Sequence, residues 1–419
     1  MYTTTTVATT SISTKIIATK EILPIWGTEY EINQKKYLRS SSSNIFHDNS
    51  IVPSSSSSND NLYIPAEHEP ISAVIITYPD YDSFKELKTK LSIAITNTGV
   101  EVWMIGRSAP QIPDNDESIQ NKELYKTINS IDIDSTWVRD YGPIIGRNML
   151  DNNIDIIDTT YRWHVARKGD DLMPCKISDL IETSISPSPS SISCVHVPGL
   201  VFDGGNILFD GNGNFFMTDR TYDWNFHLTK DEVDEQIQFY FGIHTIHSLE
   251  YALAPTGNKF YKGSGSKEPA DGTGHIDMFI KILSPCVVLI AQTDYNDDTI
   301  MYESLEKANA YFEHLSCPAS STTTGAGAGT GYYQIYRICG WYDTINSTWY
   351  TYTNSLIIND VVIIPSYNDI LQYKCNDEIA INVYKDAMPH IKEIVSINTD
   401  DSIKYGGSIH CLTRDIPKF

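Results

Sequence analysis

Short apolar runs rich in β-branched and aromatic residues recur along the chain, separated by more polar segments. They are AVIITYP (73–79), VEVWMIG (100–106), NIDIIDTTY (153–161), CVHVPGLVFDGG (194–205), MFIKILSPCVVLIAQ (278–292), NSLIINDVVIIPSY (354–367) and EIVSIN (393–398). Such runs predict strands. Between several of them apolar residues are spaced by three and four, as in residues 82–99, which predicts a helix ending at Gly99. The alternation predicts an α/β fold with roughly five strand-and-helix units and no fixed sequence period.

Two tight turns add antiparallel pairs to this pattern. The Asn359-Asp360 pair lies between two apolar runs and predicts a hairpin. The stretch DGNGN (210–214) also reads as a hairpin turn. A purely parallel, doubly wound sheet is therefore not expected.

Three segments have a strongly biased composition: SSSNIFHDNSIVPSSSSSNDN (41–61), SISPSPSSIS (184–193) and ASSTTTGAGAGTG (319–331). Such segments bury too little apolar surface to order themselves. They predict a disordered, Ser/Thr-rich arm over residues 1–61 and two surface insertions, at about 184–193 and 319–331. One ordered domain is expected over residues 62–419.

Charge and composition exclude several classes of partner. The chain has 419 residues, 41% hydrophobic content and a formal charge of −22, which repels nucleic acid and anionic lipid and favours cationic ligands. Because the charge is spread along the chain, a solvated surface is the favoured interpretation over a device that steers ligands. There is no apolar run of membrane-spanning length and no apolar signal core, so we expect a cytoplasmic protein without membrane contact.

Seven cysteines are scattered along the chain, and no two form a C-x-x-C pair. Their odd number and wide spacing indicate neither a disulfide framework nor a cysteine zinc site. We therefore expect reduced thiols. Cysteine is among the most buried residue types, so each thiol is first interpreted as a packing group.

Polar clusters interrupt the apolar runs. Asp140 follows Arg139 before a Gly-Pro turn, and alone such a pair is typical of a surface ion pair. His275 and Asp277 lie two residues apart in a strand-like run, which places both side chains on one face. His-x-Asp suits either a metal half-site or a histidine held by an acid, although no further metal ligands are evident. Asp203 ends a predicted strand before a Gly-Gly pair.

A cysteine, a histidine and two acids, without a metal or a phosphate-binding loop, suit attack on a cationic carbon. A guanidinium is planar, remains protonated and offers paired donors that match carboxylates. Asp140 and Asp277 would hold it, Cys411 would attack its carbon, and His275 would protonate the departing nitrogen and then activate water. A Cys-His amide hydrolase is the competing enzyme class, but it needs an oxyanion hole and one orienting acid.

Six stretches together resemble one family, in the family's order. They are IPAEHEPISAVIITYP (64–79), TWVRDYGPI (136–144), DGGNILFDGNGNFFMTD (203–219), GHIDMF (274–279), YTNSLIINDVVIIPSY (352–367) and YGGSIHCLT (405–413). They look like the signatures of the agmatine deiminase and bacterial-type peptidylarginine deiminase family. The resemblance implies the pentein fold, a five-bladed α/β propeller with pseudo-fivefold symmetry and a central site. It also implies a metal-free, cofactor-free hydrolase that acts on linear amidines through a Cys thiouronium intermediate.

The resemblance further assigns roles to residues. Cys411 is the implied nucleophile, His275 the acid-base, and Asp140 and Asp277 the guanidinium clamps. Substrate contacts are implied for Asp203, Arg167, Asn354 and Gly407. The stretch SIHC is expected to be a strand that carries Cys411 to the site, with His410 on the opposite face as a packing or supporting residue.

The substrate is a small guanidino compound or a peptide arginine, and two branches of the family remain open. Tyr141, Tyr78-Pro79 and Asp203 resemble the peptidylarginine branch, which converts peptidyl or C-terminal arginine to citrulline. That branch binds the substrate carboxylate with two arginines that precede an Asp-Asp pair. Here Arg167 has the matching spacing to Asp170-Asp171, but Val165 occupies the position of the second arginine. Arg162 is the candidate to replace that arginine. The alternatives are an agmatine deiminase of putrescine biosynthesis and a non-catalytic pentein scaffold. The oligomeric state is not predicted.

Overall fold

The structure, a computed structural model, describes residue 25 and the ranges 61–80, 84–110, 121–184, 191–255, 268–296, 299–317, 331–367 and 375–419. Most of the predicted arm (1–61) lies outside the described residues, as do large parts of both predicted insertions. Ile25, inside that arm, is described: it is 1% exposed, and its backbone NH donates to the carbonyl oxygen of Tyr405 at 3.1 Å. At this position the arm packs against the domain.

The described strands form five separate sheets. The first contains β1 (Leu62–Tyr63), β5 (Ile144–Asn148), β6 (Ile154–Thr160) and β7 (Ile192–Val201), and the second contains β8 (Leu208–Phe209), β9 (Asn214–Thr218) and β10 (Thr245–Leu249). The third contains β11 (Ile280–Ser284), β12 (Val287–Gln292), β13 (Gln334–Asp343) and β14 (Thr348–Thr351). The fourth contains β15 (Leu356–Ile358), β16 (Val361–Ser366) and β17 (Glu393–Asn398), and the fifth contains β18 (Arg414–Pro417), β2 (Ile71–Thr77), β3 (Glu101–Ile105) and β4 (Tyr125–Ile128).

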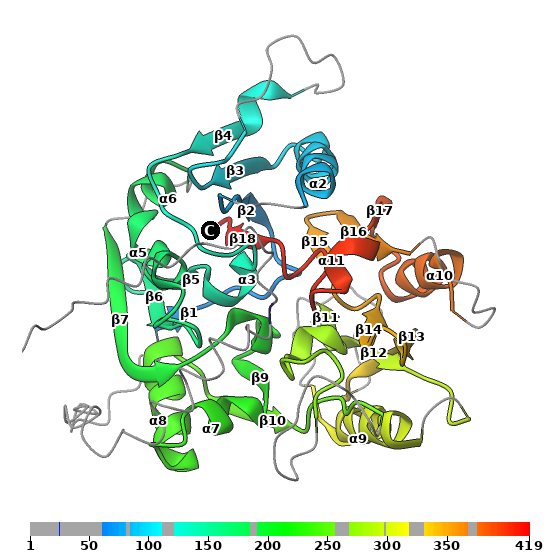
Figure 1. The fold of residues 1–419 in the computed structure, drawn as a ribbon. Coiled ribbons are helices and arrows are strands. Elements are labelled where there is room, and N and C mark those ends of the chain that lie inside the picture. The colour runs from blue at the N-terminus through cyan, green and yellow to red at the C-terminus, as the bar shows by residue number, and fades with distance from the viewer. Residues whose placement is uncertain are drawn as a thin grey trace, which may run out of the picture.

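All five sheets repeat one pairing pattern. In each, a first strand pairs antiparallel with a second, and the second pairs parallel with a third: β5-β6-β7, β8-β9-β10, β11-β12-β13, β15-β16-β17 and β18-β2-β3. The sheets surround a common centre, and in the fifth sheet β18 lies nearest to it and β4 farthest (Figure 1). This ring of sheets agrees with the pentein architecture expected from the sequence.

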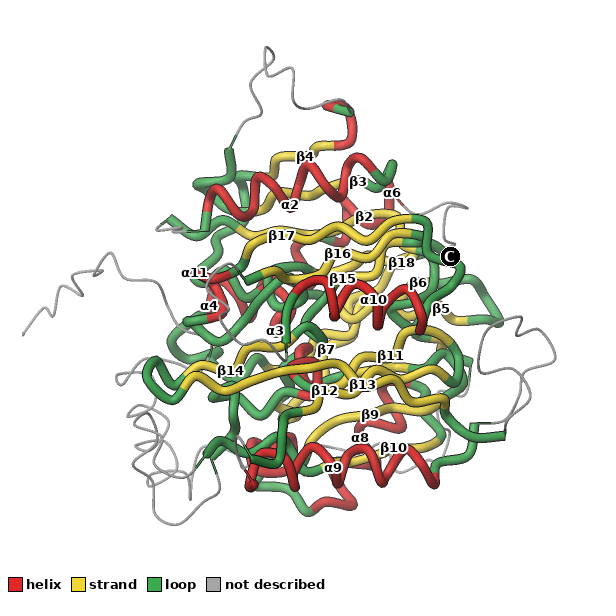
Figure 2. The backbone as a smooth tube through the Cα atoms, turned by 90° about the vertical axis from the view of Figure 1, so that its right-hand side faces the viewer, coloured by secondary structure: helices red, strands yellow, loops and turns green. Residues whose placement is uncertain are grey.

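Helices lie between the strands. They are α2 (Lys85–Asn97), α3 (Val138–Tyr141), α4 (Lys168–Asp171), α5 (Met173–Lys176), α6 (Ser178–Ser184), α7 (Arg220–Trp224), α8 (Lys230–Phe241), α9 (Thr299–His314), α10 (Asp377–Ala387) and α11 (Asp400–Ile403). All but α3 and α11 belong to the crossovers that parallel strand pairs require. α2, α9 and α10 lie toward the rim of the molecule (Figure 1), and α2 and α9 lie at opposite ends of it in the second view (Figure 2). None of the helices in the described ranges is both long and apolar enough to cross a bilayer.

Local sequence signals explain several of these boundaries. The helix predicted over 82–99 is α2, and Gly99 follows its end with φ of +83°, a conformation that glycine adopts without strain. Thr229 and Glu232 form a reciprocal capping box at the start of α8. Both predicted hairpins are confirmed, since β8 pairs with β9 and β15 with β16 in antiparallel register.

The fifth sheet closes the ring with strands from both ends of the domain. β18, near the C-terminus, pairs antiparallel with β2, which is more than 300 residues earlier in the chain, through Arg414–Ile75 and Ile416–Ala73. Ala73, Ile75 and Ile416 are fully buried. The loop before β18 is thereby held at the centre of the ring, and this loop contains Cys411.

The cysteines contradict the expectation of reduced thiols without a disulfide framework. Six of the seven form three disulfides, Cys175–Cys194, Cys286–Cys317 and Cys339–Cys375. Each pair brings Cα atoms to 5.5–5.7 Å across 19 to 36 residues, within the normal range for a bridge. The first two pairs each lie within one sheet and its crossover, whereas Cys339–Cys375 joins β13 of the third sheet to the segment before α10 in the fourth sheet's crossover. Cysteine spacing alone does not reveal such partners. Cys411 is the one free cysteine of the chain.

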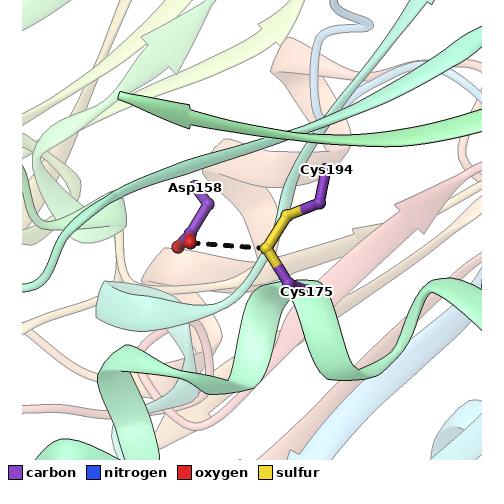
Figure 3. Close-up of side chains that lie close together, drawn as sticks. All are labelled: Asp158, Cys175 and Cys194. Carbon is purple, nitrogen blue, oxygen red and sulfur yellow. Dashed lines mark hydrogen bonds between the residues drawn. A yellow bond between two sulfur atoms is a disulfide. The ribbon is translucent and has the colours of Figure 1, made fainter. Parts of the chain in front are cut away.

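The Cys175–Cys194 bridge joins α5 to β7 beside Asp158 of β6 (Figure 3). Asp158 Oδ2 lies 3.4 Å from Cys175 Sγ and 3.2 Å from His196 Nδ1. Asp158 and the two sulfurs are close enough to share a metal ion. Because both sulfurs are bonded to each other, neither is a thiolate, and the disulfide therefore accounts for this cluster.

Candidate active site

The predicted catalytic residues lie in loops that precede the first strands of the five sheets. Asp140 lies in α3, just before β5, and Asp203 lies before β8. His275 and Asp277 precede β11, Asn354 precedes β15 and Cys411 precedes β18. Because the pairing pattern repeats around the centre, these five loops meet there. Distances between the side chains confirm that they converge.

Cys411 lies at the middle of the site and is fully buried. Its Sγ is 3.1 Å from Asn354 Nδ2 and 3.8 Å from Asp277 Oδ2. Burial raises the pKa of the Cys411 thiol well above its ordinary value, and the charges of Asp277 and Asp140 raise it further. The thiol is therefore protonated without substrate, and a cation is needed beside it to form the thiolate.

Asn354 fixes the loop that carries the thiol. Its Oδ1 accepts hydrogen bonds from the backbone NH groups of Ser408 at 3.1 Å and Cys411 at 3.2 Å. Its Nδ2 donates to Asp277 Oδ2 at 3.1 Å and also contacts Cys411 Sγ. Asn354 thus ties Asp277 and the thiol into one rigid unit, and its predicted contact with substrate stays a prediction.

His275 lies between two carboxylates. Its Nε2 is 3.1 Å from Asp203 Oδ2, and its Nδ1 is 3.5 Å from Asp140 Oδ1. Burial lowers the pKa of His275, but Asp140 and Asp203 outweigh burial, so that its pKa lies above the ordinary value. An imidazolium is the form that can donate a proton to a leaving nitrogen.

Asp203 orients His275. One carboxylate oxygen accepts from the backbone NH of Arg162 at 3.2 Å, and the other contacts His275 Nε2 and forms an ion pair with Arg162 Nε at 2.9 Å. Both oxygens are therefore engaged by protein groups. The predicted contact of Asp203 with substrate stays a prediction, and the geometry favours a supporting role.

Three buried carboxylate oxygens in this site lack a hydrogen-bond donor among the described residues. They are both oxygens of Asp140 and Oδ1 of Asp277. Burial raises the pKa of Asp140 to about 7, since His275 only partly offsets the effect of burial and Asp203 adds to it. Buried acceptors without donors are costly and rare. The three oxygens therefore suit a ligand that brings N–H donors and a positive charge.

Two glycines make room for these groups. A Cβ on Gly205 would lie 2.6 Å from His275 Nδ1 and 2.8 Å from Asp140 Oδ1. A Cβ on Gly407 would lie 2.6 Å from Cys411 Cβ and 3.0 Å from its Sγ. Gly407 therefore lies against the thiol, while its predicted contact with substrate stays a prediction.

The local structure of two motifs differs from the sequence expectation. His275-Ile276-Asp277 is not a strand, because Ile276–Met278 forms one 3-10 turn. Ser408 to Cys411 lies in a loop with turns between α11 and β18. In both places hydrogen bonds from other loops hold the backbone, notably to Asn354 and to Asn206 Oδ1, which accepts from Ile276 NH at 3.1 Å. The directions of the His275, Asp277, His410 and Cys411 side chains are therefore not set by the alternation of a β-strand, contrary to the sequence prediction.

A family model for Porphyromonas-type peptidyl-arginine deiminases matches residues 63–417. The chain belongs to this family. The deiminase is accordingly a hydrolase of C–N bonds in linear amidines, as the sequence resemblance predicted.

Relatives and solved structures agree with this assignment. An agmatine deiminase of Medicago truncatula is 23% identical over 387 residues, covering 85% of this chain and 96% of the relative. An agmatine deiminase structure from Enterococcus faecalis has 20% identity and a TM-score of 0.64, covering 86% of this chain and 98% of its own. A candidate arginine deiminase from Porphyromonas gingivalis has 21% identity and a TM-score of 0.66, covering 85% and 98%. The structures show that the deiminase has the same fold.

The arginine predicted to bind a substrate carboxylate is as deeply buried as the catalytic residues. Arg167 is fully buried, and its Nη1 donates to the Tyr161 hydroxyl at 3.4 Å. Arg162 is closer to the catalytic groups, because it pairs with Asp203. Its Nη2 donates to the carbonyl oxygen of Ile25 at 3.1 Å. Ile25 thus packs the N-terminal segment of the deiminase against the residues that flank His275.

Sequence reasoning missed a group of charged residues around Glu67. Glu67 Oε1 contacts His410 Nε2 at 2.5 Å and Arg139 Nη1 at 2.9 Å, and its Oε2 contacts Lys281 Nζ at 2.6 Å. Each of the three partners is adjacent or close in sequence to a catalytic residue. Glu67 belongs to the EHE stretch in the motif at residues 64–79, which marks it as a candidate functional residue. Only the fold shows which residues it contacts.

Asp140, Asp203 and His275 are also close enough to ligate a metal ion. Arg162 already places a cation against Asp203. The remaining free acceptors, on Asp140 and Asp277, belong to two different loops around Cys411. Acceptors placed in this way suit a planar organic cation next to the thiol better than a metal ion bound by Asp140, Asp203 and His275.

Proposed function

We propose that the deiminase hydrolyses the guanidinium group of arginine side chains through a covalent intermediate on Cys411. The observation that carries this proposal is the set of donor-free carboxylate oxygens on Asp140 and Asp277 around a buried thiol. A guanidinium supplies five N–H donors for these oxygens and a fixed positive charge beside the thiol. A neutral amide brings fewer donors and no charge, which disfavours the amide hydrolase.

In the first step, the substrate cation lowers the pKa of the Cys411 thiol by electrostatic attraction, and the thiol loses its proton to solvent to form the thiolate. The thiolate adds to the guanidinium carbon. His275 then gives its proton to one nitrogen, the C–N bond breaks and ammonia leaves, so that an S-alkylthiouronium remains on Cys411.

In the second step, neutral His275 takes a proton from water as the oxygen adds to the same carbon. The C–S bond breaks, the thiolate leaves, and the product carries a ureido group in place of the guanidinium. For an arginine substrate this product is citrulline. Asp203 keeps His275 oriented throughout, because its carboxylate contacts the imidazole Nε2.

The elevated pKa of Asp140 predicts a pH dependence of catalysis. Asp140, with a pKa of about 7 in the free protein, must be ionised to hold the guanidinium, which itself stays protonated. We expect kcat/KM to rise about tenfold per pH unit below this pKa and to level off above it. Initial rates at low substrate concentration would measure this. A flat profile between about pH 5 and 8 would contradict the required ionisation of Asp140.

The peptidylarginine branch is favoured by the Tyr141 and Asp203 signatures and by the matching family, whereas the names of several relatives support agmatine as the alternative substrate. Agmatine would give N-carbamoylputrescine, as in putrescine biosynthesis. A ureido-product assay with agmatine, arginine and peptides carrying internal or C-terminal arginine tests the function. Absence of product from all four classes would contradict it.

Arg162 and Arg167 predict how a substrate carboxylate is recognised. A carboxylate could replace the Ile25 carbonyl on Arg162, whereas Arg167 donates to the Tyr161 hydroxyl. We expect Arg162→Gln to lower kcat/KM for arginine relative to agmatine by about 10- to 150-fold, the value of a charged hydrogen bond. Arg167→Ala is the matched variant. If kcat/KM for arginine relative to agmatine fell in Arg167→Ala but not in Arg162→Gln, Arg167 would be the residue that binds the carboxylate, as the sequence predicted.

We infer one catalytic domain from residue 62 onward, because all five loops must meet around Cys411. The cytoplasmic location remains a prediction from the sequence alone. The three disulfides argue for an oxidising compartment instead, since structural disulfides are rare where thiol reductants are abundant. A small guanidino compound or peptide arginine remains the proposed partner.

A further inference from the structure

His410, the residue before the proposed nucleophile, lies between two carboxylates. Its Nδ1 is 2.6 Å from Asp277 Oδ2, and its Nε2 is 2.5 Å from Glu67 Oε1. The imidazole is fully buried. Because ionised carboxylates only accept hydrogen bonds, both ring nitrogens must donate, and His410 then carries a positive charge.

The contact from His410 determines which oxygen of Asp277 is available. Oδ2 accepts from His410 Nδ1 and from Asn354 Nδ2, whereas Oδ1 has no donor in the described part of the chain. Two donors on one oxygen fix the carboxylate plane. Oδ1 is thereby left for the guanidinium.

Glu67 in turn holds His410 and connects the catalytic loops. Besides His410, it binds Lys281, four residues after Asp277, and Arg139, next to Asp140. Lys281 Nζ also donates to the Ser355 carbonyl oxygen at 2.7 Å, beside Asn354. Burial raises the pKa of Glu67, but the three cations together outweigh burial and hold the pKa well below its ordinary value. Glu67 therefore stays ionised as a fixed anchor.

We propose that His410, anchored by Glu67, is a positioning residue that holds Asp277 for guanidinium recognition. The proposal rests on the proposed function, because it assumes that Asp277 Oδ1 binds the substrate cation. It assigns to His410 a role beyond packing. Neither His410 nor Glu67 needs to touch the substrate.

Two substitutions of His410 separate its contact with Asp277 from its contact with Glu67. In His410→Asn the amide nitrogen can stand near the position of Nδ1 and keep the donor to Asp277, while the reach to Glu67 is lost. In His410→Gln the amide lies near the position of Nε2, so the contact with Glu67 is kept and the donor to Asp277 is lost. His410→Leu removes both. We expect kcat/KM to fall about 10- to 100-fold in the Gln and Leu variants and only a few-fold in the Asn variant.

Alkylation of Cys411 provides a readout that does not depend on turnover. 2-Chloroacetamidine is a planar cation, and 2-chloroacetamide is its neutral counterpart. In both reactions the thiolate displaces chloride and forms a thioether. We expect the wild type to react faster with the amidinium, and the ratio of the two rates to collapse in His410→Gln and His410→Leu but to persist in His410→Asn. The rate with the neutral reagent and the melting temperature report general damage to the fold.

The outcomes separate the two proposals. A wild-type rate ratio and kcat/KM in His410→Leu, or a loss in His410→Asn as large as in His410→Gln, would overturn the positioning role. If the wild type converts no guanidino substrate, the proposed function fails, and the alkylation ratios still show whether cation recognition depends on His410.

Discussion

Cys411→Ser is expected to lower kcat by about four orders of magnitude or more, the scale seen when a covalent nucleophile is removed. A serine hydroxyl is far less acidic than a thiol, and His275 must stay protonated to release ammonia, so no base is available to activate the hydroxyl. Steady-state rates of ureido-product formation would measure the loss. The change is small in volume, and the fold should persist.

A matched control replaces cysteines that take no part in the chemistry. The double variant Cys175→Ser with Cys194→Ser removes a disulfide between α5 and β7. It should lower the free energy of unfolding by about 2–5 kcal/mol, while turnover of the folded protein is unchanged. Wild-type turnover in Cys411→Ser would return Cys411 to the role of a buried structural thiol.

The second large effect concerns the two acids that face the substrate. Asp140→Asn and Asp277→Asn should each reduce kcat/KM by about 10²- to 10⁴-fold. An amide removes the negative charge and presents a donor against the donors of a guanidinium. In Asp277→Asn the contact with His410 is also weakened. Kinetics on arginine and agmatine would measure both losses.

Asp210→Asn is the control for these two variants. Asp210 is fully buried, and its Oδ1 accepts backbone hydrogen bonds from Asn212 and Asn214 in a hairpin turn, which an amide oxygen can still accept. Its Oδ2 accepts from Asn214 Nδ2 and the Tyr333 hydroxyl, so the amide should cost stability. Because these partners lie outside the catalytic loops, turnover of the folded protein should change little. If either site variant retained near-normal turnover, the two-acid clamp would have to be abandoned.

The sequence was sufficient for the parts of the site that chemistry and motif order constrain together. Asp140, His275, Asp277 and Cys411 were expected to meet although they lie in three separate segments, because a guanidinium-directed reaction needs all of them. The structure brings these four side chains together at the centre of the ring. The hairpin at Asn359 and the helix end at Gly99 also followed from local turn chemistry.

The remaining features depend on contacts between distant segments. Cys339 and Cys375 pair because β13 and the start of α10 are packed together by the fourth sheet's crossover. Glu67 meets His410 across 343 residues. The 3-10 turn at Asp277 is set by neighbouring loops, whereas its sequence resembles a strand. Local patterns contain no information on such partners.

The most direct test of the central claim is the mass of the protein during turnover. Wild-type protein mixed with arginine substrate, quenched in acid within one turnover and analysed intact, should carry the substrate mass less one ammonia, and peptide mapping should locate it on Cys411. The same adduct should accumulate in His275→Ala, in which water activation is slowed. An adduct on any other residue, or product formation by Cys411→Ser without an adduct, would contradict the account.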